Sequence, residues 1–181
     1  QYAERAVTIN PRLGWSLESL FATQCRNGDW EGALETLSKA RRHGQLDKSV
    51  ADRRRAVLLT GQALALEETD SPRALALATE AHGLAPDLVP AAAIAGRLLS
   101  QQGGTPRAAR ILQKTWRLSP HPDLATAYAF ARIGDSPRDR LARMRELARL
   151  TPHNDEGQIG IAVAAIDAQE WETARRVLSH L

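Results

Sequence analysis

The sequence predicts an all-α fold, a right-handed solenoid of about five helical hairpins. Three segments carry this prediction because they share one pattern: SPRALALATEAHGLAP from Ser71, TPRAARILQKTWRLSP from Thr105 and SPRDRLARMRELARLTP from Ser136. Each opens on Ser or Thr followed by Pro, which caps and starts a helix, and each closes on a Pro that stops it. A pattern that returns about every 34 residues is typical of repeat proteins, in which each hairpin packs on its neighbours.

The rest of the chain fits the same register. Arg140 stands at a position that four other units fill with a small residue, namely Ala33, Ala74, Ala108 and Ala174. The successive spacings along this series are 41, 34, 32 and 34 residues. The turns Gly28–Glu31 and Gln169–Glu172 also match, and the apolar runs between the three segments supply the other helix of each hairpin.

The elements follow in chain order. AERAVTINP, which ends at Pro11, is expected to close a preceding unit, so residues 1–11 are interpreted as the tail of a repeat within a single domain of residues 1–181. We expect hairpins at about 12–45, 46–86, 87–120, 121–152 and 153–181. Their helices are expected at about 2–9, 12–27, 29–43, 47–68, 71–84, 87–102, 105–118, 121–133, 136–150, 153–168 and 170–181. Strict alternation and Asn-Gly turns are lacking, so no strand is expected.

The spacing of 41 residues leaves about seven extra, which we place in LDKSVADRRR, from Leu46 to Arg55. This segment has neither Pro nor Gly, and Asp47 can cap a helix. It therefore predicts that the first helix of the second hairpin is lengthened to about 20 residues, or about 30 Å. The added turns are expected to project from one edge and to bring residues 53–55 (Arg-Arg-Arg) with them.

Composition excludes several classes of protein. With 43% hydrophobic residues the chain can bury a core, and its only cysteine, Cys25, cannot form an internal disulfide. The chain has 24 Lys and Arg residues against 21 Asp and Glu residues, so its net charge does not indicate a nucleic-acid partner. No run of 18 apolar residues predicts a membrane span, so the chain itself is expected to be soluble. Because it opens on Gln1, in the tail of a repeat, we interpret it as a fragment of something longer.

The sequence also lacks the patterns of an enzyme or a metal site. There is no G-x-S-x-G, no phosphate-binding loop, no recognisable carboxylate pair and no metal-ligand spacing. The five histidines form no i, i+4 pair, and Cys25 lies in no haem-attachment motif, so no cofactor is expected. Stacked hairpins expose an extended surface, which favours a non-enzymatic role in binding other proteins.

The 34-residue period, the early small residue and the terminal Pro resemble the tetratricopeptide repeat (TPR), although Ala65 and Leu99 replace the usual aromatic residue of the first helix. The segments NGDWEGALETL, DKSVADRRRAVLLTGQALALE, EAHGLAPDLVPAAAIAGRLL and TWRLSPHPDLATAYA are similar to the repeat region of HemY-type proteins of proteobacteria. This resemblance implies anchoring in the inner membrane by a segment absent here. It also implies a repeat domain on the cytoplasmic face, a link to late haem biosynthesis, and no catalytic residues to carry over.

The leading hypothesis is thus a scaffold that holds haem-biosynthetic enzymes. A general peptide-binding TPR co-chaperone or assembly factor is the alternative, and a haem carrier that uses an exposed histidine is a third. The Lys and Asn clamp of chaperone-binding repeats is missing, because the corresponding positions hold Glu18/Ala22, Leu59/Ala63 and Ala93/Arg97.

The family register places four candidate binding residues on the inner face of successive first helices: Arg26, Arg97, Gln101 and Arg132. Arginine makes bidentate bonds to carboxylates, so this set predicts an acidic segment on the partner. An unused, solvated face is the alternative.

Large and charged side chains elsewhere are expected to have structural roles. Trp30, Trp116 and Trp171 are expected to pack against neighbouring helices, whereas Trp15 could face the core or the groove. In the Arg-rich segment from Ser136, helical spacing predicts ion pairs of Asp139 with Arg143 and of Glu146 with Arg149.

Overall fold

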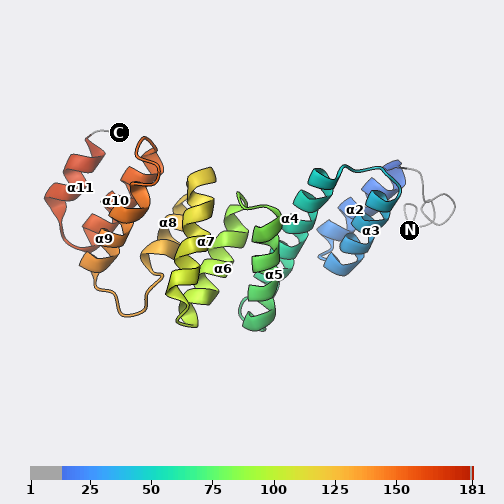
Figure 1. Cartoon of the computed structure of the whole chain (residues 1–181), viewed down its shortest axis with the longest axis horizontal. Coiled ribbons are helices and arrows are strands. Elements are labelled where there is room, and N and C mark those ends of the chain that lie inside the picture. The colour runs from blue at the N-terminus through green and yellow to red at the C-terminus, as the bar shows by residue number, and fades with distance from the viewer. Residues whose placement is uncertain (1–13, 180) are drawn as a thin grey trace.

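A computed structural model describes residues 14–179 and 181. Over these residues the chain forms ten helices and no strand. The expected helix at 2–9 lies outside the described residues. Figure 1 shows the helices following one another along the long axis, from α2 at one end to α11 at the other.

The helices pair in chain order as antiparallel hairpins. The first helices of the hairpins are α2 (Gly14–Arg26), α4 (Lys48–Leu66), α6 (Val89–Gln101), α8 (Pro122–Ala129) and α10 (Asp155–Asp167). The second helices are α3 (Trp30–Arg42), α5 (Ser71–Leu84), α7 (Thr105–Leu118), α9 (Pro137–Ala148) and α11 (Trp171–Leu178). The fold is therefore all-α and TPR-like, built of sequential hairpins, as the sequence predicts.

The Ser/Thr-Pro segments begin helices in two different ways. Ser136 acts as predicted: its side chain accepts from the Asp139 amide in a reciprocal capping box. The caps before α5 and α7 lie one residue earlier than predicted, at Asp70 and Gly104. Ser71 and Thr105 instead become the first helical residues, and Thr105 Oγ1 donates to the Ala131 carbonyl, 3.0 Å away.

The small-residue position of the register lies in the core. Its four alanines, at 33, 74, 108 and 174, are all buried. A small side chain at this point lets the second helix approach the first closely. Arg140, which holds the same position in α9, is only partly buried, so the fourth hairpin departs from the rule.

The tryptophans separate into packed and exposed ones. Trp116 is fully buried and donates from Nε1 to Thr151 Oγ1 at 2.7 Å, which confirms the prediction for it. Trp30 packs on α4, where its indole lies 3.1–3.3 Å from the point that a Cβ on Gly61 would occupy. The prediction for Trp171 is wrong, because its side chain is 53% exposed, and Trp15 is exposed as well.

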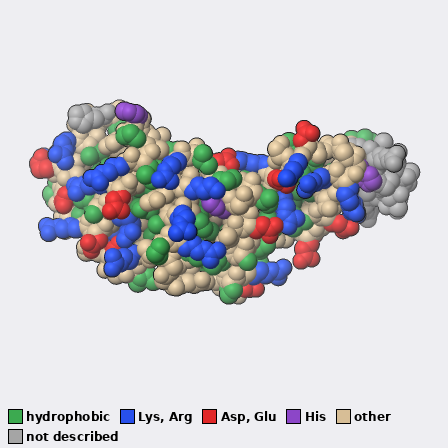
Figure 2. All heavy atoms as spheres, viewed as in Figure 1, with side chains coloured by type: hydrophobic (Ala, Val, Ile, Leu, Met, Phe, Trp, Pro, Cys, Tyr) green, Lys and Arg blue, Asp and Glu red, His purple; other side chains and the backbone are tan. Residues whose placement is uncertain are grey.

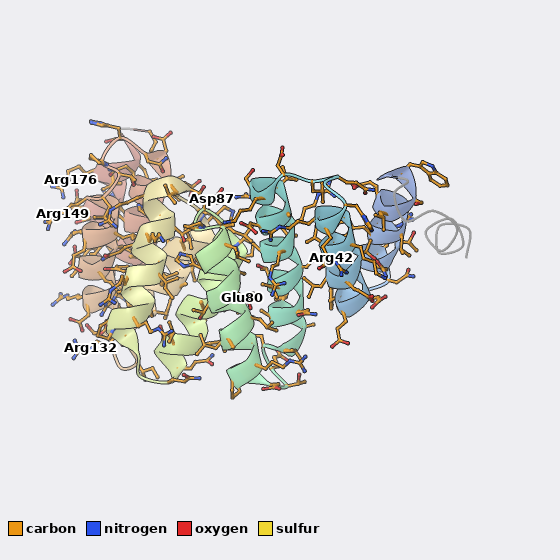
Figure 3. All side chains as sticks on the ribbon, turned by 45° about the vertical axis from the view of Figure 1, so that its right-hand side comes forward. Arg42, Glu80, Asp87, Arg132, Arg149 and Arg176 are labelled. Carbon is orange, nitrogen blue, oxygen red and sulfur yellow. The ribbon has the colours of Figure 1, made fainter. Side chains whose placement is uncertain are left out.

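The inserted residues lengthen a helix, as predicted: α4 has 19 residues. However, its arginines are not carried away from the body. Arg54 pairs with Glu18 of α2 at 2.7 Å, Arg55 with Glu80 at 2.7 Å, and Arg53 with Asp87. Figure 3 labels two of the acceptors, Glu80 and Asp87. Three ion pairs therefore tie the lengthened helix to its neighbours on both sides. The hydrogen bond from Arg53 also holds the pKa of the Asp87 carboxyl below its usual value.

The helix α8 is shorter than predicted. It ends at Ala129 rather than near residue 133, and Gly134 has a left-handed backbone with φ of +89°. Asp135 then turns back onto α9, where Arg143 donates to its carboxylate at 2.6 Å and Arg140 to its carbonyl at 3.0 Å. The expected pair of Asp139 with Arg143 is thus wrong, because Asp139 is engaged by Ser136 and Arg143 by Asp135. Within the described residues no ion pair joins Glu146 to Arg149.

A buried histidine should make stability depend on pH. His82 of α5 is buried, and among the described residues its Nε2 has no hydrogen-bond partner. Burial lowers the pKa of His82, and the charge of Lys114 adds to the effect. The unfolded imidazole takes up a proton near pH 6.5, whereas the folded one resists it, so stability is complete above that pH and decreases as the pH falls below it.

We therefore expect the melting temperature to fall between about pH 7 and pH 5, and His82→Leu to remove part of that slope. Thermal melts followed by circular dichroism at a series of pH values check this. An unchanged slope in the variant would show that His82 does not contribute.

Candidate protein-binding groove

Exposed apolar side chains gather on the first helices. They include Val57 and Leu64 of α4, Phe130 and Ile133 in the turn that follows α8, and Ile159, Val163 and Ile166 of α10. Scattered exposed apolar residues are normal, but apolar residues that gather on one face of a soluble protein mark a surface for binding. The first helices therefore carry the candidate site.

Two adjoining hollows form a groove in this face. One lies between α6 and α8 and is lined by Arg97, Ser100, Gln101, Asp123, Thr126, Ala127, Phe130 and Ile133. The other lies between α8, α9 and α10, and its walls include Ala125, Met144, Ile159, Gly160 and Val163. Thr126 and Phe130 border both hollows, so the two form one continuous surface, which we call the first-helix groove.

Phe130 stands at the centre of the first-helix groove. Its side chain is 56% exposed, and the guanidinium carbon of Arg140 lies 4.8 Å from the centre of its ring. A cation over an aromatic face is attracted by the ring's electrons and holds the ring in place. The aromatic anchor thus has a defined orientation although more than half of it is open to solvent.

The irregular fourth hairpin explains why the groove is there. With eight residues α8 is the shortest of the first helices, and Arg140 stands where the other second helices have alanine. A long side chain at this position prevents the close approach that alanine permits elsewhere. The apolar side of α10, including Ile159 and Val163, is correspondingly left open.

Charges at the rim are mostly engaged within the protein. Arg97 makes two hydrogen bonds to the Glu67 carboxylate, at 2.9 and 3.0 Å. The second hollow is bordered by Glu156 and Asp167 as well as by Arg140. Any acidic group that reaches Arg97 would therefore have to compete with Glu67.

The structure brings together only two of the four predicted binding residues. Arg97 and Gln101 line the same hollow of the groove. Arg132 lines a different, polar hollow against α9, with its Nε 3.7 Å from Asp135. Arg26 is exposed at the last position of α2, and it lines neither hollow of the groove.

Sequence reasoning missed the apolar residues of the groove. Thr126, Phe130 and Ile133 in one segment, and Ile159 and Val163 in another, recur at spacings of three and four residues. That spacing was the available signal, because in a continuous helix it would place each set on one face. In the structure α8 ends just before Phe130. The signal is hidden because the opposite faces of both helices are also apolar.

The second helices present a contrasting, basic surface. Figure 2 shows Lys and Arg side chains spread over the visible face, with Asp, Glu and hydrophobic side chains between them. On α7 the cations Arg107, Arg110, Lys114 and Arg117 recur at helical spacing, and that helix has no acidic residue. The basic face of α7 thus contrasts with the apolar first-helix groove.

Within the described residues no group of three His, Cys, Asp or Glu side chains is placed to hold a metal ion. The same part of the chain contains no helix that is long and apolar enough to cross a membrane.

One curated protein resembles the chain in sequence. The two are 32% identical over 156 residues, or 86% of this chain, and the relative is described as "Probable magnetosome protein Mms48" of Magnetospirillum gryphiswaldense. The match covers 35% of that protein, so the chain spans about a third of its length. No family model matches the sequence.

The solved structures that resemble this chain are more distant from it in sequence than this curated relative. MamA of Desulfovibrio magneticus RS-1, from residue 41 to its end, is 18% identical with a TM-score of 0.47 and 92% of each chain covered. TTC0263, a thermophilic TPR protein of Thermus thermophilus, is 19% identical with a TM-score of 0.42, covering 91% of this chain and 87% of that one. Because both TM-scores are below 0.5, the assignment of the fold rests on the helix packing described above. Nothing in the comparisons supports the HemY-type resemblance or a link to haem synthesis.

Proposed function

We propose that this chain is a non-enzymatic scaffold that binds an amphipathic helix of another protein in the first-helix groove. The observation that carries the proposal is the exposure of Phe130 between two hollows, with Ile159 and Val163 opposite it. Apolar grooves of this kind bind the apolar face of a helix, whose residues at i, i+3 or i+4 and i+7 enter successive hollows. No catalytic constellation accompanies the groove in the described residues.

The chemistry of the groove defines the partner segment. Apolar side chains would occupy the hollow beside Phe130, and a carboxylate on the same segment would meet Arg97 and Gln101 after displacing Glu67. Arg26 and Arg132, which lie outside the groove, would then contact the partner only if it extends beyond both ends of this surface. The proposal thus keeps the acidic partner segment that the sequence predicts, with its carboxylate placed at Arg97 and Gln101.

The experiment compares pull-downs from the native host by wild-type protein and by Phe130→Asp plus Val163→Asp. Because both side chains are exposed, circular dichroism and melting should be unchanged. Recovery of the specific partners should fall at least tenfold, which corresponds to about 1.4 kcal/mol of lost binding free energy. Leu118→Asp, at an exposed apolar residue at the end of α7, is the matched control. Equal recovery by all three proteins would refute the groove as the binding surface.

A second pair of substitutions tests the charged part of the proposal. Arg97→Glu plus Arg132→Glu should weaken capture if the partner carries an acidic segment, whereas Arg107→Glu plus Arg110→Glu on the second helices should not. Full recovery with the first pair would mean that binding in the groove is apolar only.

The identity of the recovered proteins decides between the finer functions. The printed name of the relative makes magnetosome proteins the first candidates. Recovery of late haem enzymes would favour the HemY-type scaffold, whose inner-membrane anchor would lie outside this chain. Recovery of chaperones would instead favour a co-chaperone. A haem carrier predicts a stoichiometric Soret shift that one histidine substitution abolishes.

A further inference from the structure

The solvent side of α7 concentrates positive charge. Four cations recur along it at spacings of three and four residues, and all are exposed: Arg107, Arg110, Lys114 and Arg117. We call these four side chains the α7 stripe. The helix contains no Asp or Glu, so its 14 residues carry a charge of +4. The whole chain carries +3, so all of its other residues together carry −1.

The α7 stripe lies on a rigid support. The opposite side of α7 is part of the core, where Ile111, Leu112 and Trp116 are buried. Thr115 Oγ1 also donates to the Pro86 carbonyl at 2.8 Å, which holds the helix against the segment that follows α5. Because the backbone is fixed, a partner meets four cations already in line over about 15 Å.

The α7 stripe differs from the arginines of other helices that have a carboxylate partner. Those pairs join segments far apart in the fold, as in Arg55–Glu80, Arg97–Glu67 and Arg143–Asp135. Among the described residues no ion pair joins the α7 stripe to a carboxylate, and Arg117 donates only to the Gln113 carbonyl of its own helix at 3.3 Å. Like charges one turn apart repel each other. The α7 stripe therefore lacks the carboxylates that would balance its charge, and a second molecule can supply them.

The width of the α7 stripe indicates the kind of partner. Figure 1 shows α7 between α5 and α9, and these neighbours carry the exposed acids Glu80 and Glu146. An anionic membrane is flat and would meet these acids together with the cations, whereas a single segment follows α7 alone. Trp116, the aromatic residue of α7, is buried and offers no ring on which a nucleic-acid base could stack. One acidic segment of a protein fits best.

We propose that the α7 stripe binds a helix of another protein that carries Asp or Glu at positions i, i+3, i+7 and i+10. Two helices packed side by side have the same rise per residue, so carboxylates at this spacing meet the four cations in turn. Arginine can bind each carboxylate through two charge-assisted hydrogen bonds. No described helix of this chain has acids at four such positions, so the occupant is not a second copy. The α7 stripe lines neither hollow of the first-helix groove, and the proposal does not depend on that groove.

The probe is a fluorescent peptide of about 17 residues, made of alanine and glutamine with four glutamates at i, i+3, i+7 and i+10. Anisotropy titrations should show saturable binding to the whole protein. Because exposed charges are screened by salt, raising the salt from about 50 mM to about 300 mM should weaken binding at least tenfold. A peptide of the same composition with its glutamates spread around the helix is the matched control and should bind at least tenfold more weakly. Equal binding of the two peptides would overturn the proposal.

Substitutions test whether the peptide binds to α7. Arg107→Glu plus Arg110→Glu should weaken its binding at least tenfold, with circular dichroism unchanged. Arg138→Glu plus Arg149→Glu reverses two exposed cations of α9 and is the matched control, which should bind like the wild type. An equal loss in both variants would overturn the proposal, because general attraction between charges would then account for binding.

The first-helix groove and the α7 stripe can fail separately. Phe130→Asp plus Val163→Asp should lose the groove partner and keep the peptide, whereas Arg107→Glu plus Arg110→Glu should do the reverse. Sedimentation with phosphatidylglycerol vesicles tests the membrane. If the protein sediments with these vesicles through Arg107 and Arg110 but does not bind the peptide, the proposal is wrong.

His82 supplies a measurement specific to this site. Burial lowers the pKa of its imidazole, and the charge of Lys114 lowers it further. Carboxylates bound at Lys114 would offset that charge, so the His82 imidazole should titrate at a higher pH in the complex. Nuclear magnetic resonance of the imidazole protons follows this titration with and without the peptide. An unchanged titration in the saturated complex would show that the peptide binds elsewhere.

Discussion

Trp116→Ala is expected to cause a large loss of stability, about 3–5 kcal/mol in the free energy of unfolding. The side chain is fully buried in the main core cluster, and its indole also donates to Thr151. Truncation would leave a cavity between α7 and the following hairpin and would remove the partner of the Thr151 hydroxyl. Urea unfolding followed by circular dichroism measures the loss.

The matched control for this substitution is Trp171→Ala, which removes the same atoms from an exposed site and should cost less than about 1 kcal/mol. Because hairpins contact chiefly their neighbours, amide exchange in the Trp116 variant should accelerate most in α7, α9 and α10. Equal losses for the two variants would show that burial is not what makes Trp116 important for stability.

Asp135→Ala is expected to cost about 2–3 kcal/mol, because it leaves the Arg143 guanidinium nearly buried without its carboxylate. The turn that joins α8 to α9 would loosen, and the stacking of Arg140 on Phe130 with it. We expect faster amide exchange over residues 130–140 and weaker partner capture by the groove.

The control for this substitution is Asp123→Ala, whose carboxylate is exposed and lies 3.6 Å from His121. It should change the free energy of unfolding by less than about 0.5 kcal/mol. If Asp135→Ala had an equally small effect, the ion pair with Arg143 would not be what holds the turn.

Local features of the sequence were enough to predict the hairpins. The start signals and the small-residue position each act within a few residues, and the period of about 34 residues repeats them along the chain. The helix pattern and the absence of strands from the described residues therefore follow from the sequence. The added length of α4 followed in the same way, because a segment without Pro or Gly continues a helix. Trp116 could be recognised as a packing residue because the interface it fills is repeated along the chain.

The candidate site depended on contacts between distant residues. Arg97 is held by Glu67, which lies 30 positions away in the sequence. Arg143 pairs with Asp135, eight residues before it, and not with Asp139, which is closer in sequence. The early end of α8 follows from that turn, and it opens the surface around Phe130 that sequence reasoning missed.

The sequence by itself determined which residues form helices and which helical position faces the core, because backbone hydrogen bonds, caps and periodicity are local. Only the tertiary structure decided which side chains remain exposed. Trp30 and Trp171 occupy the same position in nearly the same sequence, yet one packs on Gly61 and the other meets solvent. Whether a side chain is buried depends on the neighbouring helix that covers it, and the tertiary fold determines which helix that is.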